Sequence, residues 1–284
     1  MGYNFRMNKI LEKVQLSPDV FSLKIEAKHI AQARKAGQFI ILMAKPDGER
    51  LPLTIADANA DEGWILIIFQ TVGEGTIKLA QLNAGDHIAH LLGPLGSPSH
   101  IEKYDGPVIC IGGGVGVAPM HPIAKALKAA GNEVIIIIGA RNKDLIIMQK
   151  ELEAFADQLI ICTDDGSAGR KALVTEPLKE LCESLPHIGE VFTLGPPIMM
   201  KFCEAVTRPF NIPTTASLNT IMIDGTGMCG GCRVTIDGET KFVCVDGPEF
   251  DAHKVDWNNM MMRQQSYKDF EAETKHKCKI GLNT

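Results

Sequence analysis

The chain has 284 residues, of which 45% are hydrophobic and 22% are charged. This composition is typical of a folded globular protein and excludes a disordered or low-complexity chain. The length suffices for one large domain or two ordinary ones. The 29 basic and 34 acidic residues give a net charge of -5 with no basic block, which argues against a nucleic-acid binder.

The hydropathy pattern gives no sign of a membrane protein. The longest apolar runs, such as residues 134–138, are far shorter than the roughly 20 residues that a membrane-spanning helix needs. Residues 1–10 carry polar and basic side chains and no apolar stretch typical of a secretory signal. We therefore expect no membrane segment and a cytoplasmic location.

Short apolar or alternating runs, separated by turn residues, fill the first hundred positions. They cover residues 21–27, 38–44, 64–72 and 87–92. This pattern is typical of antiparallel strands, and it predicts a small β-barrel domain over residues 1–103.

The pattern changes after residue 104, where apolar strands alternate with helical segments. Strands are expected at residues 107–111, 133–138, 159–162 and 191–194, and helices at 117–130, 144–156, 176–185 and 198–206. The first helix would end at Gly131, since glycine favours the position after a helix. The alternation predicts a parallel sheet with helices on both faces, forming an α/β domain over residues 104–212.

The third predicted region, residues 213–284, is rich in glycine and holds three of the eight cysteines within sixteen positions. A long chain without a secretory signal is not expected to form a disulfide framework. The five scattered cysteines are most simply buried small hydrophobic residues. They are Cys110, Cys162, Cys182, Cys203 and Cys278.

The clustered cysteines indicate a metal centre. Cys229 and Cys232 have the two-residue gap that lets two thiolates reach one metal centre. Residues 233–243 form two β-like runs around Asp237-Gly238, a favoured hairpin turn. Folding this hairpin brings Cys232 and Cys244 opposite each other to within about one residue, so three thiolates converge.

A fourth ligand is expected, and Asp224 stands where it belongs. In plant-type [2Fe-2S] sites a cysteine precedes the close pair by five positions, and here that position holds aspartate. The pattern favours a [2Fe-2S] cluster held by Asp224, Cys229, Cys232 and Cys244. A structural zinc or a hairpin with free thiols is the alternative. Asp224 could also only cap a turn, leaving water or Asp246 as the ligand.

A glycine cluster directly follows the predicted strand at 107–111 and opens a helix. At such a junction the backbone N–H groups can receive a pyrophosphate, although Pro119 replaces the last glycine of the usual dinucleotide fingerprint. A tight turn is the alternative. The segment consists of Gly112, Gly113, Gly114, Val115 and Gly116.

Two segments of the barrel region suit a second phosphate-bearing ligand. An arginine and a hydroxyl beside an extended strand, and a glycine-threonine turn, can each bind phosphate, although each alone is more often an ordinary loop. The first segment is Arg50, Leu51, Pro52, Leu53 and Thr54, and the second contains Gly73, Gly75 and Thr76.

Together these segments resemble the ferredoxin reductase-like flavoproteins, and among them the electron-transfer subunits that carry a [2Fe-2S] cluster. The resemblance implies a β + α/β fold, in which the barrel holds FAD through the two segments just named. It also implies that residues 112–116, with Gly195 and Pro196 of a second glycine segment, bind NAD(H). The cofactors would carry out the redox chemistry, so no catalytic side chain is expected.

Two groups within this family share the pattern. One comprises electron-transfer subunits of dihydroorotate dehydrogenase, which have four cysteine ligands. The other comprises small subunits of NADH-dependent reduced ferredoxin:NADP oxidoreductases, in which aspartate holds the first ligand position, and Asp224 favours this group. Resemblance to this second group implies a heterodimer with a larger flavoprotein that carries [4Fe-4S] clusters and reacts with ferredoxin and NADP(H). The complex would perform flavin-based electron bifurcation.

Two further alternatives remain open. From a different functional class, the chain could be a non-catalytic interaction module stabilised by zinc. For the nucleotide, Arg141 after the second strand of the α/β domain could meet the 2′-phosphate of NADP, whereas the nearby Asp144 would repel it. The family resemblance implies NAD(H).

Overall fold

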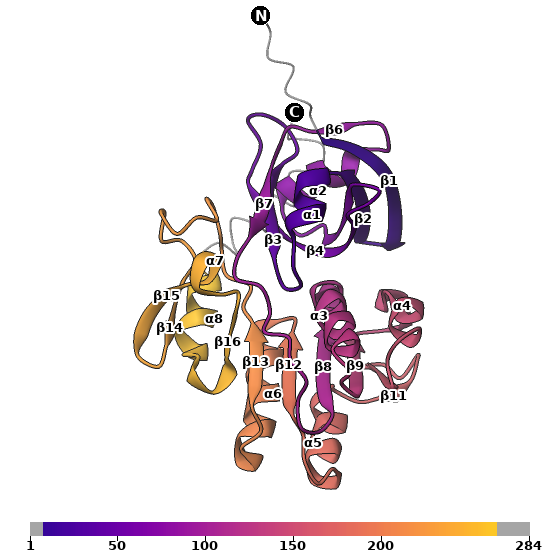
Figure 1. Cartoon of the computed structure of the whole chain (residues 1–284), viewed down its shortest axis with the longest axis vertical. Coiled ribbons are helices and arrows are strands. Elements are labelled where there is room, and N and C mark those ends of the chain that lie inside the picture. The colour runs from indigo at the N-terminus through magenta and orange to yellow at the C-terminus, as the bar shows by residue number, and fades with distance from the viewer. Residues whose placement is uncertain (1–7, 266–284) are drawn as a thin grey trace, which may run out of the picture.

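The computed structural model describes residues 8–265. Figure 1 shows three parts: a barrel at the top, a parallel sheet with its helices below, and a smaller cysteine-bearing part that contacts both. Within the described residues, no helix is long and apolar enough to cross a membrane.

The first part is the predicted antiparallel barrel, nearly closed, with strand order β6-β1-β2-β5-β4-β3-β7. Its strands are β1 (Asn8–Ser17), β2 (Val20–Glu26), β3 (Phe39–Met43), β4 (Leu51–Asn59), β5 (Trp64–Gln70), β6 (His87–Ile88) and β7 (His90–Leu95). Two helices, α1 (Lys28–Ala33) and α2 (Glu74–Gln81), complete it. The sequence did not predict β1, because only Ile10 and Ser17 of that strand are buried and its apolar pattern is weak.

The second part is a seven-stranded sheet with the order β11-β10-β9-β8-β12-β13-β16. Its strands are β8 (Val108–Gly113), β9 (Val134–Ala140), β10 (Gln158–Thr163), β11 (Arg170–Lys171), β12 (Glu190–Leu194), β13 (Thr214–Ser217) and β16 (Glu249–Asp251). All neighbours are parallel except β13 and β16. Two strands from the third predicted region thus extend this sheet, while the division into domains at residues 103 and 212 stays a prediction.

Helices cover both faces of the sheet, as the alternation of strands and helices predicts. They are α3 (Val117–Ala129), α4 (Gln149–Glu153), α5 (Thr175–Ser184) and α6 (Pro197–Thr207), with short 3-10 turns η1 (Gly114–Gly116), η2 (Lys143–Leu145) and η3 (Arg208–Phe210). Cys110 of β8 packs in the core with α3, whereas Ile109 and Ile111 pack in the core with α5. Each face of the strand therefore has its own hydrophobic core.

The helix predicted for residues 144–156 is wrong. The chain forms the turn η2, then an extended stretch, and only five residues of helix in α4. Met148 has a left-handed φ of 57° and Ile147 is buried in the core, so the chain leaves the helical path to place Ile147. Tertiary packing has overridden the helical pattern here.

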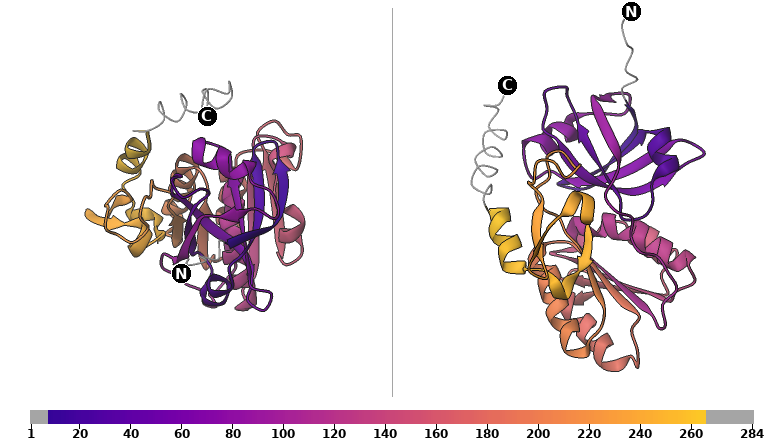
Figure 2. Two further views of the ribbon diagram at one scale, coloured as in Figure 1. Left: turned by 90° about the horizontal axis from the view of Figure 1, so that it is seen from above. Right: turned by 60° about the vertical axis from the view of Figure 1, so that its left-hand side comes forward.

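The third part consists of the hairpin β14 (Arg233–Ile236) and β15 (Glu239–Phe242), the short helix α7 (Val243–Asp246), the turn η4 (Ala252–Lys254) and α8 (Trp257–Gln265). Its core includes Cys232, Cys244 and Met260, together with Phe39 and Ile41 of the barrel. The third part therefore has no separate core, and Figure 2 shows it lying along both other parts. Of the scattered cysteines, four are buried as predicted and Cys278 lies outside the described residues.

Candidate functional site

The predicted NAD-binding segments meet at the carboxyl ends of two neighbouring strands. Strand β8 leads into the glycine segment 112–116, and β12 leads into Gly195 and Pro196. The next strand along the chain, β9, lies on one side of β8 in the sheet, and β12 lies on the other side. In open α/β sheets the crevice at such a reversal of strand order is where ligands bind.

Tight packing between these two segments explains their glycines. A Cβ atom on Gly116 would collide with the backbone of Leu194 and Gly195, and one on Gly113 would collide with Met199. Gly114 differs, since a Cβ there would meet nothing within 4 Å. Open space in front of a glycine at a helix entrance fits the approach of a pyrophosphate.

Arg141 lies at the same edge of the sheet, directly after β9, and its side chain is exposed. The neighbouring segment 112–116 follows β8, which pairs with β9. All the predicted NAD-binding residues are therefore on one side of the α/β part. Their role in binding stays a prediction.

The two predicted FAD segments are also brought together. The backbone N–H of Gly75 donates a hydrogen bond of 3.0 Å to the Glu49 carboxylate, and a Cβ on Gly75 would come within 2.9 Å of Leu51. Gly75 thus faces the start of β4, directly beside the exposed Arg50. An amide that already binds an anionic group fits a phosphate, although the exposed Glu49 side chain must then leave it.

Thr76 supports this loop from within. Its hydroxyl accepts hydrogen bonds from the N–H groups of Val72 and Gly73 and donates one of 2.9 Å to the Gly73 carbonyl. The hydroxyl therefore shapes the turn at the start of α2, which carries the Gly75 amide. Glu49 was not predicted from the sequence, because a lone acidic residue before a strand carries no distinctive signal.

The hairpin brings two of the cysteines together as predicted. Arg233 pairs with Phe242 at its end, and the N–H of Val243 donates to the Cys232 carbonyl. The sulfur atoms of Cys232 and Cys244 lie 3.2 Å apart in a buried position. The register is therefore within one residue of direct opposition.

The Asp224 carboxylate lies against the backbone of Cys229 at the exposed end of the loop. The Asp224 carboxylate accepts a hydrogen bond of 2.6 Å from the N–H of Cys229 and one of 2.8 Å from the N–H of Thr226. The aspartate thus does cap the turn. An ionised carboxylate has about four acceptor positions, so capping leaves room for a metal bond.

The pKa values of Asp224 and Cys244 are shifted in opposite directions. The hydrogen bond from the backbone of Thr226 lowers the pKa of Asp224, so its carboxylate is ionised. Burial, followed by the contact with Cys232, raises the pKa of Cys244 to about 12. A bound metal reverses this effect, because coordination removes the proton from a thiol.

The ligand pairs fit two metal ions better than one. Among residues 8–265, no three His, Cys, Asp or Glu side chains are grouped so as to hold a single ion. A tetrahedral zinc site needs four donors around one point, whereas a [2Fe-2S] cluster takes two from the protein at each iron. The adjacent sulfur atoms of Cys232 and Cys244 suit one iron of the cluster, and Asp224 with Cys229 is the pair predicted for the other.

The elements that carry the three predicted sites contact one another around β4. Helix α3, which follows the NAD-binding loop, packs against β4, and His121 of α3 bonds the Ala56 carbonyl at 3.1 Å. Strand β4 carries the FAD segment, and its Pro52 is paired with Ile41 of β3. A Cβ on Gly225 of the cysteine loop would come within 2.8 Å of Ile41. One strand thus separates the FAD segment from the cysteine loop.

Comparisons with known proteins agree with this arrangement. Residues 110–205 match the oxidoreductase NAD-binding domain, and residues 219–256 match the iron-sulfur cluster binding domain of dihydroorotate dehydrogenase B. A protein of Thermotoga maritima, named a dihydroorotate dehydrogenase B electron transfer subunit homolog, is 45% identical over 93% of both chains. The chain belongs to this family of electron-transfer subunits and their homologues.

Other members show the breadth of the family. The dihydroorotate dehydrogenase B electron transfer subunit of Streptococcus mutans is 31% identical over 87% of this chain and 96% of its own. A solved structure described as NADH-dependent reduced ferredoxin-NADP oxidoreductase is 42% identical, with a TM-score of 0.90 over 98% of this chain and 99% of its own. This electron-transfer subunit is thus a component of an oxidoreductase and has the ferredoxin reductase-like fold. Its cofactors are FAD, NAD(H) and a [2Fe-2S] cluster. It works with a larger partner subunit.

Proposed function

We propose that this chain is the NAD(H)-side subunit of an NADH-dependent reduced ferredoxin:NADP oxidoreductase that performs flavin-based electron bifurcation. The solved oxidoreductase supports this choice, because it is 42% identical to this chain and has a TM-score of 0.90 over 98% of it. Asp224 at the first ligand position supports it from the sequence.

The observation that carries the proposal is the succession of sites around β4. The NAD-binding loop is connected to β4 through α3, and the cysteine loop touches Ile41 directly opposite Pro52. Bound FAD would supply the change from the two-electron chemistry of NADH to the one-electron chemistry of the cluster. A relay of this kind needs its carriers to lie next to one another.

The residues of this chain hold and orient the carriers. The amides of residues 112–116 receive the nucleotide pyrophosphate, and Arg50 with the Gly75 amide receives the flavin phosphates. Asp224, Cys229, Cys232 and Cys244 hold the cluster. Its partner would be a larger flavoprotein with [4Fe-4S] clusters, which reacts with ferredoxin and NADP(H).

A second candidate is the electron-transfer subunit of a dihydroorotate dehydrogenase. The match of residues 219–256 to the cluster domain of that enzyme favours it. The two candidates share the cofactors of this chain and differ in the partner subunit.

Purification of the native complex tests both candidates. We expect a yellow-brown complex in which mass spectrometry identifies FAD and a [4Fe-4S] flavoprotein partner, and metal analysis finds iron. A dihydroorotate dehydrogenase catalytic subunit as the partner would support the second candidate instead. A colourless protein containing zinc would contradict both and favour an interaction module.

A further inference from the structure

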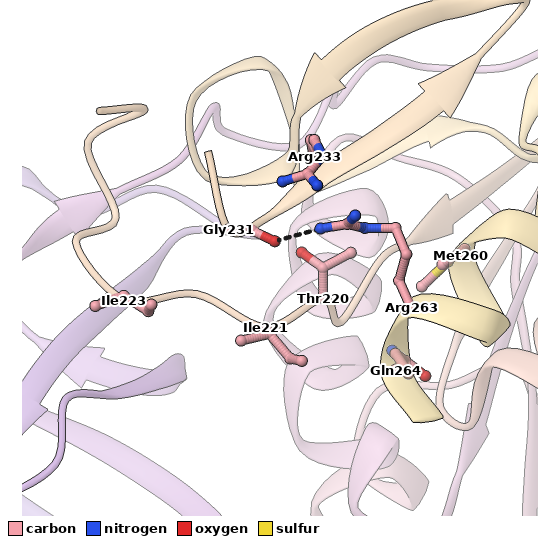
Figure 3. Close-up of a pocket in the computed structure, with 8 residues that line it drawn as sticks. All are labelled: Thr220, Ile221, Ile223, Gly231, Arg233, Met260, Arg263 and Gln264. Carbon is pink, nitrogen blue, oxygen red and sulfur yellow. Dashed lines mark hydrogen bonds between the residues drawn. The ribbon is translucent and has the colours of Figure 1, made fainter. Parts of the chain in front are cut away.

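A pocket of about 290 Å³ lies between the cysteine loop and helix α8. Arg233, at the start of the hairpin, and Arg263, on α8, both line it, and Gly231 of the cysteine loop lies beside them (Figure 3). Two guanidinium groups therefore lie beside the segment that connects two of the proposed cluster ligands.

Both arginines bind carbonyl groups of that segment. Arg263 donates a hydrogen bond of 3.3 Å from Nη2 to the Gly231 carbonyl, and Arg233 donates one of 3.1 Å from Nη1 to the Gly230 carbonyl. Gly230 and Gly231 are the two residues between Cys229 and Cys232. The arginines thus hold the carbonyl groups of both spacer residues.

One of these peptide groups also points at a ligand sulfur. The N–H of Gly231 donates to the sulfur of Cys229 at 3.4 Å, and it shares its peptide group with the Gly230 carbonyl. A cation bound to the carbonyl polarises the peptide and strengthens the hydrogen bond made by its N–H. Arg233 therefore acts on Cys229 through a single peptide group.

No acidic side chain neutralises this pair of charges in the described part of the chain. Among residues 8–265, neither Arg233 nor Arg263 has a carboxylate within ion-pair distance. Arg263 is half-buried and Arg233 is exposed. The charge of Arg263 is consequently less screened by water.

We propose that Arg233 and Arg263 are positioning residues that raise the reduction potential of the cluster. Both fix the Gly230–Gly231 spacer and place positive charge beside a centre that becomes more negative on reduction, and Arg233 also strengthens the hydrogen bond to the Cys229 sulfur. Net charge and hydrogen bonds to sulfur are among the factors that set the potentials of iron-sulfur clusters. The inference rests on the proposed cluster and assigns to two further residues a role in its function.

The test is a redox titration of the holoprotein with its native partner, followed by electron paramagnetic resonance. We expect Arg263→Gln to lower the midpoint potential of the cluster, and Arg233→Gln to lower it by a smaller amount. Arg263→Lys keeps the charge and should recover part of the shift. Arg170→Gln is the matched control, since Arg170 is paired with Glu180 on the α/β part, and its potential should equal that of the wild type.

The outcomes separate this inference from the proposed function. A wild-type complex without a [2Fe-2S] signal would overturn the proposed cluster itself. A normal wild-type signal, with the same midpoint potential in Arg263→Gln and Arg233→Gln, would overturn only the role of the arginines. Loss of iron from Arg263→Gln with FAD retained would support the positioning role, because the retained FAD shows that the barrel is intact.

Discussion

The NAD-binding loop and the cysteine loop are both rich in glycine, for different physical reasons. In the first loop, Gly113 and Gly116 are required by neighbours that come from a segment about eighty residues later in the chain. A side chain at Gly116 would collide with the backbone of Leu194, which no rotamer change can relieve. Packing between distant segments therefore dictates these glycines.

In the cysteine loop the glycines permit a backbone conformation that other residues rarely adopt, and Gly225 in addition packs against Ile41 of the barrel. Gly225, Gly227 and Gly230 have φ values of 72°, 83° and 66°, in the left-handed region that glycine adopts most readily. Asp224 then fixes the turn by accepting two backbone N–H groups. The structure of the NAD-binding loop should therefore be disrupted when a side chain is added to its glycines. The structure of the cysteine loop should be disrupted when the Asp224 carboxylate is removed.

The largest effect is expected at Asp224. Asp224→Ala removes both the turn cap and a proposed ligand, so iron content and the electron paramagnetic resonance signal should be lost. Asp224→Cys restores four cysteine ligands and should keep a [2Fe-2S] cluster with a changed spectrum and midpoint potential. Identical spectra and potentials in Asp224→Cys and the wild type would show that Asp224 only caps the turn.

The next largest effect distinguishes two glycines of the NAD-binding loop. Gly114→Val places a side chain in open space, at a φ of 55°, and should weaken NADH binding by about 100-fold while FAD stays bound. Gly116→Ala should instead lower the melting temperature, because its Cβ meets backbone atoms. Fluorescence titration with NADH and thermal unfolding measure the two effects, and unaltered NADH affinity in Gly114→Val would place the nucleotide elsewhere.

A smaller effect is expected at the FAD segment of the barrel. Arg50→Ala removes a charge-assisted contact to phosphate of about 1.5 to 3 kcal/mol, so FAD affinity should fall roughly 10- to 100-fold. Glu49→Gln is the opposite control, since it removes a carboxylate that competes for the Gly75 amide and should strengthen FAD binding. Flavin occupancy measured after dialysis checks both, and wild-type occupancy in Arg50→Ala would refute the assignment.

The last effect concerns stability where the segment after β7 meets β16 of the seven-stranded sheet. Glu249 bonds the Ser99 hydroxyl, and burial raises the pKa of Glu249 from 4.5 to about 7, with Glu190 adding repulsion and the Ser99 bond opposing the shift. A raised pKa gives stability that is complete below about pH 4.5 and is lost as the pH rises through 7.

Glu249→Gln, which stays neutral, should therefore remove this pH dependence. Relative to the variant, the wild type should lose up to about 3 kcal/mol of unfolding free energy between pH 5 and pH 8. Chemical denaturation at both pH values measures the difference. Parallel pH profiles for the two proteins would show that Glu249 titrates normally.

The sequence alone determined the repeating features of this protein. Period-two and strand-helix patterns predicted the barrel and the parallel sheet, and the glycine after α3 was placed correctly, with a φ of 87° at Gly131. The spacing of Cys229, Cys232 and Cys244 around a favoured turn predicted their approach, because a hairpin's register follows from its turn. These features depend on residues that are near one another in the chain.

Only the tertiary structure decided the rest. The chain is extended at Ile147 because this side chain packs into the hydrophobic core. Strands β13 and β16 belong to the seven-stranded sheet, although their sequences lie in the cysteine-bearing region. The contact of Gly225 with Ile41, and the hydrogen bond between Arg263 and Gly231, join residues that no local pattern relates. Such contacts depend on how separate elements pack, and this packing cannot be predicted from the local pattern of residue types along the sequence.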